Sequence, residues 1–242
     1  MGQTKFFLLW FQAPLQSWGF DSRFGRRETW NYPTRSGVLG LLLCAMGAGG
    51  PQRELLARFG SLDLTGYSLA PVKAAPFAQP AGKVLTDFHM VGSNYDESDL
   101  WQNLLIPKKT DGKAPNGSGS KMTYRRYLQD SVLAAVLEVP SDLAEQAAQA
   151  LTHPYWDMYL GRKCCVPTAP IYRGTFETAQ QAEQALASLA DENGLRIDSK
   201  ALTGSFPDEG ETMTIEDDPV AFGLRKVYKP RTVTMVKLFQ EQ

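Results

Sequence analysis

The sequence predicts an α+β fold, and the first part of the chain follows the element order of a ferredoxin-like domain. Segments of strand and helix length alternate over residues 1–152 in the order strand, helix, strand, hairpin insert, strand and helix. A further strand and helix, and then a late basic strand, follow that stretch. We therefore expect a ferredoxin-like domain in residues 1–176 with a long β-hairpin insertion at 76–126. A smaller, β-rich C-terminal extension, residues 177–242, is expected to end in the basic strand.

Four elements are predicted before the insert. Residues 4–11 (TKFFLLWF) are short, apolar and aromatic, which is typical of a buried strand, and Pro14 ends its pairing. Residues 38–46 form an apolar helix that is closed by a glycine-rich stretch. Residues 51–59 fit a second helix, because proline is tolerated in a first turn, and residues 62–73 alternate as a strand does.

The polar insert separates these elements from the next ones. Glycine, proline, serine, asparagine and lysine dominate residues 76–120, and a stretch of this length inside a compact domain is often functional. Residues 84–91 and 121–129 are predicted to pair as the two arms of a long hairpin. Residues 131–139 (SVLAAVLEV) are predicted to be a strand or another buried segment, and an Ala-rich helix is expected over residues 141–151.

Three elements are predicted in the remainder of the chain. Residues 171–176 supply the last strand of the ferredoxin-like order. Residues 178–190 carry Ala and Leu on one helical face, and residues 231–239 (RTVTMVKLF) alternate as a strand.

The charge is divided unevenly along the chain. The net charge is −1, but residues 1–174 hold 18 Lys and Arg against 14 Asp and Glu, and residues 175–219 hold 2 against 11. Residues 220–242 hold 5 against 1. This division is compatible with a basic face that binds nucleic acid, and equally with a solvated acidic surface that binds nothing.

Composition excludes several classes of protein. The chain is 43% hydrophobic and 21% charged, which is typical of globular proteins. No apolar run reaches the roughly 18 residues of a membrane span, so no membrane partner is expected. Three cysteines and two histidines are too few for a disulfide framework or a zinc site, and no carboxylate pair has metal-site spacing. We expect a cytoplasmic protein without metal or cofactor.

Residues 12–19 (QAPLQSWG) join the first strand to a stretch rich in aromatic residues and arginines. Aromatic rings stack nucleobases and guanidinium groups pair with phosphates, so this region could form a platform for single-stranded RNA. A loop whose aromatic residues are buried is the alternative.

Two further segments could contact phosphate. Residues 33–37 (PTRSG) place hydroxyls, a guanidinium and free backbone N–H groups at a helix N-terminus, where the helix dipole favours anions. Simple N-capping by Thr34 or Ser36 explains the same pattern. Residues 159–163 (YLGRK) combine a glycine turn with adjacent cations, and an ordinary surface turn is the alternative there.

Taken together, six segments resemble the Cas5 family, the RAMP-superfamily subunits of CRISPR Cascade complexes, and in particular those of type I-E. They are the first strand (FFLLW), QAPLQSWG, PTRSGVLGLLLCAMG, TYRRYLQD, YLGRKCC and the late basic strand. The resemblance covers residue 6 to about residue 174 and continues weakly to the C-terminus. QAPLQSWG followed by PTRSGVLGLL at this spacing is its most distinctive part.

The resemblance implies an RRM-like ferredoxin fold with a protruding β-hairpin thumb. It also implies a non-catalytic subunit that holds the 5′ handle of the CRISPR RNA, caps the base of Cascade and contacts its backbone and large subunits. Target DNA would be met only through the assembly. Together with the arginines noted above, it implies these RNA-binding residues: Gln12, Ala13, Pro14, Gln16, Trp18, Gly19, Arg26, Arg27, Pro33, Thr34, Arg35, Ser36, Gly37, Arg125, Arg126, Tyr159, Leu160, Gly161, Arg162 and Lys163.

An endoribonuclease that processes precursor CRISPR RNA is the main alternative. A related branch of the family cuts RNA without metal and needs a Tyr, a Lys and a His close together. Tyr124, Lys121 and His89, on the opposing hairpin arms, are the grouping that could serve here. A metabolic α/β enzyme is a third possibility, but the sequence carries no cofactor fingerprint.

Overall fold

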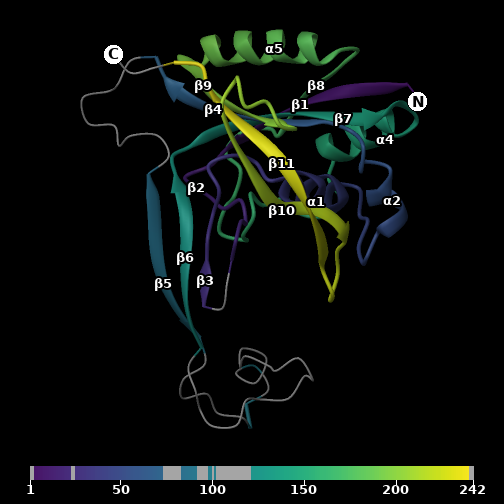
Figure 1. Ribbon diagram of the computed structural model, residues 1–242. Coiled ribbons are helices and arrows are strands. Elements are labelled where there is room, and N and C mark those ends of the chain that lie inside the picture. The colour runs from purple at the N-terminus through teal and green to yellow at the C-terminus, as the bar shows by residue number, and fades with distance from the viewer. Residues whose placement is uncertain are drawn as a thin grey trace.

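A seven-stranded antiparallel sheet forms the centre of the protein in the computed structural model (Figure 1). The structure describes residues 3–22, 25–72, 83–91, 98, 99, 101 and 121–239. The strands lie in the order β10-β11-β9-β4-β7-β1-β8. Their bounds are β1 Thr4–Gln12, β4 Leu64–Pro71, β7 Val132–Pro140, β8 Tyr172–Phe176, β9 Leu195–Thr203, β10 Glu211–Ala221 and β11 Val227–Lys237.

Helices cover both faces of this sheet. Because side chains alternate between the two faces of a strand, neighbouring residues of β1 pack against different helices. Phe7 and Leu9 of β1 pack on one face in a cluster with residues of α1 (Arg35–Ala45), α2 (Arg53–Ala57) and α4 (Ser141–Thr152). Leu8 and Trp10 pack on the other face with α5 (Ala179–Glu192). Figure 1 shows the resulting three layers, with α5 on one side of the sheet and the other helices opposite.

The C-terminal strands extend the same sheet. β9 pairs with β4, with Gly66 opposite Ala201, and β11 pairs with β9 and β10. β9 and β10 were not predicted from the sequence, whereas the predicted late strand is present as β11 and begins earlier than expected. Trp30 and Tyr32 pack against Ile215 and Val233, so the segment before α1 also lies against these strands.

A second, smaller sheet carries the hairpin. β2 (Leu15–Gln16) and β3 (Arg26–Arg27) flank β6 (Lys121–Gln129), and β5 (Val84–Val91) pairs with β6. The predicted pairing of residues 84–91 with 121–129 is confirmed, and the two arms project away from the main sheet in Figure 1. The polar part of the insert between the arms lies, apart from residues 98, 99 and 101, outside the described residues.

Within the part of the chain that the structure describes, none of the helices combines the length and the apolar composition that a membrane crossing requires.

Candidate nucleic-acid interface

Three segments that are far apart in the sequence meet beside the first turn of α1. The backbone N–H of Ser17 donates to the carbonyl of Leu160 at 2.9 Å. Gly37 faces the ring of Trp18 so closely that a Cβ there would lie 2.8 Å from a ring carbon. QAPLQSWG, PTRSG and YLGRK therefore form one structural unit, and much of the contact between them is buried.

Trp18 belongs to the core of that unit. Its side chain is 1% exposed, and its ring packs against Phe11 with the ring centroids 4.8 Å apart. Its Nε1 donates to Gln16 Oε1 at 3.0 Å, and Gln16 Nε2 in turn donates to the carbonyls of Phe11 and Ser131 at 3.0 and 2.6 Å. A ring buried in this way has no free face for a base, so we reassign Trp18 and Gln16 from RNA contact to positioning of the loop.

Arg35 is also a buried structural residue. Its Nε lies 2.9 Å from Asp218 Oδ1, and its terminal nitrogens donate to the carbonyls of Leu62 and Phe59. Burial lowers the pKa of the Arg35 guanidinium, and the charge of Asp218 opposes that shift. The expectation that Arg35 binds phosphate is therefore corrected: its charge is met by carboxylates of the same chain.

The helix N-terminus next to Arg35 already holds an anion. Thr34 is the N-cap, and its side chain accepts from the Gly37 N–H at 3.3 Å. The Arg35 N–H donates to Asp217 Oδ2 at 2.7 Å, and Asp217 also accepts from Arg231 at 2.6 and 3.0 Å. Capping by Thr34 is confirmed. A carboxylate from β10 occupies the place where the sequence suggested a phosphate, because the helix dipole favours either anion.

The remaining members of the predicted set differ in exposure. Ala13, Pro33 and Leu160 are buried, as Thr34 is, and their side chains support the fold. The others are exposed or half-buried: Gln12, Pro14, Gly19, Arg26, Arg27, Ser36, Gly37, Arg125, Arg126, Tyr159, Gly161, Arg162 and Lys163.

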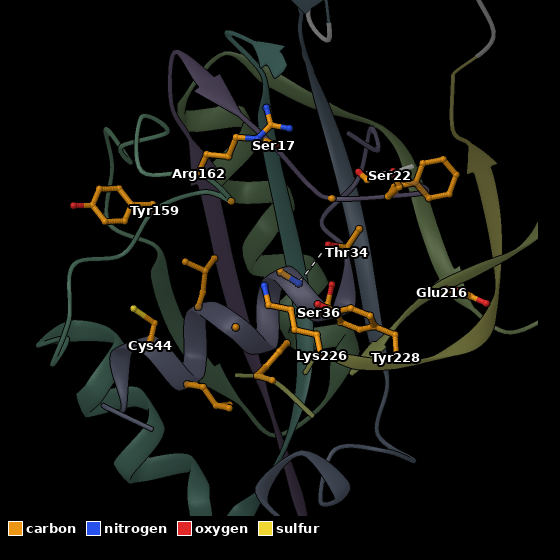
Figure 2. Close-up of a pocket in the computed structure, with 18 of the residues that line it drawn as sticks. Ser17, Ser22, Thr34, Ser36, Cys44, Tyr159, Arg162, Glu216, Lys226 and Tyr228 are labelled. Atoms are coloured by element: carbon orange, nitrogen blue, oxygen red, sulfur yellow. Dashed lines mark hydrogen bonds between the residues drawn. The ribbon is translucent and has the colours of Figure 1, made fainter. Parts of the chain in front are cut away.

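The accessible parts of the three segments line one open groove of about 1480 Å³. Its floor is the uncovered face of α1, where Ser36, Gly37, Gly40 and Cys44 recur at helical spacing. In Figure 2, Tyr159 and Arg162 lie on one side of α1, and Glu216 and Tyr228 lie on the other. At these four small residues an extended ligand can approach the helix closely, while Leu41 and Leu43 of α1 also line the groove.

Cations line both sides of the groove. Lys163 is exposed on the side of Arg162, and Lys226 is exposed on the side of Tyr228, in the turn between β10 and β11. Acidic residues line it as well, including Glu28 and Glu216. The groove therefore offers phosphate-binding groups at discrete points rather than a uniformly basic surface.

Arg162 holds the wall of the groove in place. Its terminal nitrogens donate to the carbonyls of Arg126 and Arg27 at 2.8 and 3.1 Å, and its guanidinium lies 4.4 Å from the ring centroid of Tyr127. These contacts tie the YLGRK loop to β3 and β6. Through Arg162, the groove is joined to the base of the hairpin.

Comparison with known proteins gives a consistent assignment. A family model described as CRISPR-associated protein (Cas_Cas5) matches residues 6–234. The chain belongs to the Cas5 family. This Cas5 chain is also 24% identical over 203 residues to the CRISPR system Cascade subunit CasD of Escherichia coli (strain K12), covering 83% of this chain and 84% of CasD.

Two solved structures resemble the Cas5 chain in fold. One, described as a CRISPR RNA-guided surveillance complex, contains a chain with 24% identity and a TM-score of 0.68, with 96% of this chain and 89% of that chain covered. The other, a crystal structure of a Cas protein, has 25% identity and a TM-score of 0.56, with coverage of 96% and 94%. The mixed α+β fold is therefore shared along almost the whole chain.

The residues suggested for RNA cleavage are not brought together by the hairpin of this Cas5 chain. His89 lies opposite Thr123, whereas Tyr124 lies opposite Phe88 and their rings are 5.2 Å apart. Because neighbouring residues of a strand point to opposite faces, His89 and Tyr124 project from different sides of the hairpin. Lys121 pairs with Val91 at the far end of the described arms.

Several groove residues of the Cas5 chain were missed by sequence reasoning. Lys226 and Tyr228 come from the β10–β11 hairpin, and Gly40, Cys44 and Trp156 line the groove along α1. The clustered cations of GLRKVYK and the small residues at positions 36, 37, 40 and 44 were the signals available. Neither signal points to RNA without the tertiary arrangement.

Proposed function

We propose that this Cas5-family chain is a non-catalytic RNA-binding subunit of a type I-E CRISPR Cascade complex. It holds the 5′ handle of the CRISPR RNA in the groove along α1 and caps the base of the assembly. The observation that carries the proposal is that the three segments QAPLQSWG, PTRSG and YLGRK line one groove, with Lys163 and Lys226 on opposite sides of it.

The arrangement of the main sheet supports a ferredoxin-like unit. The elements β1, α1, β4, β7, α4 and β8 follow the order of that fold, and their strands lie side by side as β4-β7-β1-β8, all antiparallel. RRM domains commonly stack RNA bases on the open face of such a sheet. Here helices cover both faces, so the RNA is expected in the groove instead.

The chemistry of the groove suits a bent single strand. Lys163 and Lys226 can each neutralise a phosphate, and the hydroxyl of Ser36 can donate to a phosphate or a ribose oxygen. The glycines of α1 let the sugar–phosphate backbone approach the helix. Arg26 and Arg27, exposed on β3, extend the positive charge from the groove towards the hairpin.

The hairpin fits the role of a thumb that contacts a neighbouring subunit. Phe88 and Tyr124 are about half exposed, as are the cross-strand neighbours Met90 and Met122, and the four side chains share one face of the hairpin. Exposed apolar patches of this kind mark protein interfaces. We assign this face to contact with the backbone subunit of Cascade. Target DNA is recognised by base pairing with the guide RNA, so this chain contacts DNA only through the complex. The complex acts in the cytoplasm.

Cross-linking of the full-length chain to RNA tests the proposal. The chain is incubated with a repeat-derived RNA that carries the 5′ handle, irradiated, digested and mapped by mass spectrometry. Cross-links on peptides around residues 159–163 and 226–228 are expected, and a shuffled RNA of equal length is the control. Cross-links confined to α5 or to the outer strands would contradict the groove assignment.

The same mixture separates binding from cleavage. Repeat RNA incubated with the chain in EDTA is expected to remain intact, because His89 and Tyr124 project from opposite faces of the hairpin. Cleavage at one site that is lost in Tyr124→Phe would instead favour the nuclease function.

A further inference from the structure

Trp156 occupies the end of the groove that the proposed phosphate contacts leave unexplained. It lines the groove together with Cys44, Ala48 and Gly49, at the C-terminal end of α1. Its side chain remains 44% exposed, although tryptophan is the largest apolar side chain. An exposed indole inside a groove needs a reason, because it loses the burial that normally stabilises it.

The segment that carries Trp156 is fixed to α1. The N–H of Tyr155 donates to the carbonyl of Ala45 at 2.8 Å. Cys44 Sγ lies 3.4 Å from the carbonyl oxygen of Asp157 and 3.8 Å from that of Trp156, as a weak donor to both. The indole is therefore presented by a held backbone and not by a free loop.

Glycines make room for the aromatic pair. A Cβ on Gly49 would lie 3.1 Å from the indole of Trp156, and a Cβ on Gly47 would lie 2.8 Å from the ring of Tyr155. The two rings meet edge to face at 5.2 Å and 83°. Tyr155 thus supports the indole from outside the groove, while Cys44, Ala48 and Gly49, which line the groove near Trp156, are all small.

We propose that Trp156 stacks a nucleobase of the RNA strand held along α1. This inference rests on the proposed function. The 11 residues of α1 span about 16 Å, so phosphate contacts near its first turn and a base beside its last turn fit one continuous strand. Small residues and Asp157 around the indole fit a single planar base better than the broad apolar core of a protein interface.

Paired changes in protein and RNA test the inference. Fluorescence anisotropy of handle RNA is measured with the full-length chain and with Trp156→Leu and Trp156→Phe. Leucine keeps apolar area but loses the aromatic face. Trp156→Leu is expected to weaken binding on the order of 10-fold, and Trp156→Phe less. Phe206→Ala, which removes an aromatic ring that is exposed outside the groove, is the control and is expected to bind normally.

A scan of abasic nucleotides through the same RNA identifies the stacked base. At one position the abasic RNA is expected to bind the full-length chain more weakly, and Trp156→Leu is expected to add no further loss there. Equal losses with every abasic RNA would overturn stacking. Normal RNA affinity of Trp156→Leu would overturn stacking as well. If that variant also fails to join Cascade, Trp156 contacts a protein subunit instead.

The proposed function fails by a different result. If the unmodified chain shows no preference for handle RNA over shuffled RNA, and Lys163→Ala and Lys226→Ala change nothing, the groove does not bind the handle. If those results support the groove while the Trp156 variants bind like the unmodified chain, only the stacking inference is lost.

Discussion

Gly161 and Ser17 are packed so closely that a Cβ on Gly161 would lie 1.7 Å from the carbonyl oxygen of Ser17. Gly161 also has a φ of +99°, which only glycine adopts readily. This contact locks the YLGRK loop against QAPLQSWG, and it explains why a glycine stands between a buried leucine and the arginine that clamps the groove wall.

Gly161→Ala is therefore expected to destabilise the protein by at least about 2 kcal/mol, from strain at positive φ together with the clash. Urea unfolding of the purified chain measures the change. Gly194→Ala is the matched control, because Gly194 also has positive φ, +66°, but a Cβ there would meet nothing within 4 Å. Equal losses of stability in the two variants would mean that the loop is not locked by Ser17.

Arg35→Ala is expected to cost about 3–5 kcal/mol of stability, because it removes the guanidinium that pairs with the buried carboxylate of Asp218 and donates to the carbonyls of Leu62 and Phe59. Thermal or urea unfolding measures this. Arg58→Ala, which breaks the exposed pair with Asp142, is expected to cost less than about 1 kcal/mol. A well-folded Arg35→Ala protein with weakened RNA binding would show that Arg35 contacts RNA after all.

Lys163→Ala and Lys226→Ala are expected to act on binding and not on folding, because both side chains are exposed. Each loss of a phosphate contact reduces the slope of log affinity against log salt by about 0.7 for a single strand. Anisotropy titrations between low and moderate salt measure that slope. Lys237→Ala, which removes an exposed lysine that does not line the groove, serves as the control. An unchanged slope in both groove variants would place the RNA elsewhere.

Phe88→Ser and Tyr124→Ser are expected to weaken assembly with the neighbouring subunit by about 1–2 kcal/mol each, roughly 5- to 30-fold. The melting temperature should stay the same, since both rings are about half exposed. Size-exclusion chromatography of the reconstituted complex provides the measurement. His89→Ala changes the opposite face of the same hairpin. If it impairs assembly as much, the apolar face is not the contact.

Local sequence patterns predicted much of the fold. β1, the hairpin arms and α5 show clear alternation, helical spacing or polar boundaries, and their positions agree with the structure to within a few residues. β9 (LRIDSKALT) and β10 (ETMTIEDDPVA) lack clean alternation and contain Asp and Pro, which disfavour strands. They are strands because β4 and β11 supply partners, and that information is not local.

The same limit applies to the candidate site. The resemblance pointed to three segments that the structure places at one groove. Local sequence could not separate a buried arginine from one that binds phosphate, because the carboxylate that pairs with the Arg35 guanidinium is Asp218 in the distant strand β10. Trp18 was open to either role for the same reason, and its burial depends on Gly37 and Phe11. Lys226 and Trp156 became visible only once the strands and helices were placed.

The ion cluster around Asp217 also sets the order in which the groove can form during protein synthesis. Arg35 leaves the ribosome long before Asp217 and Arg231 have been translated, so the first turn of α1 must wait for its carboxylate. Lys226, on the wall of the groove, is also translated after Asp217. Nascent chains that stop before β10 would therefore lack both the anchor of α1 and one wall. If the groove binds guide RNA as proposed, we therefore expect binding by a nearly finished chain and not by one in early translation.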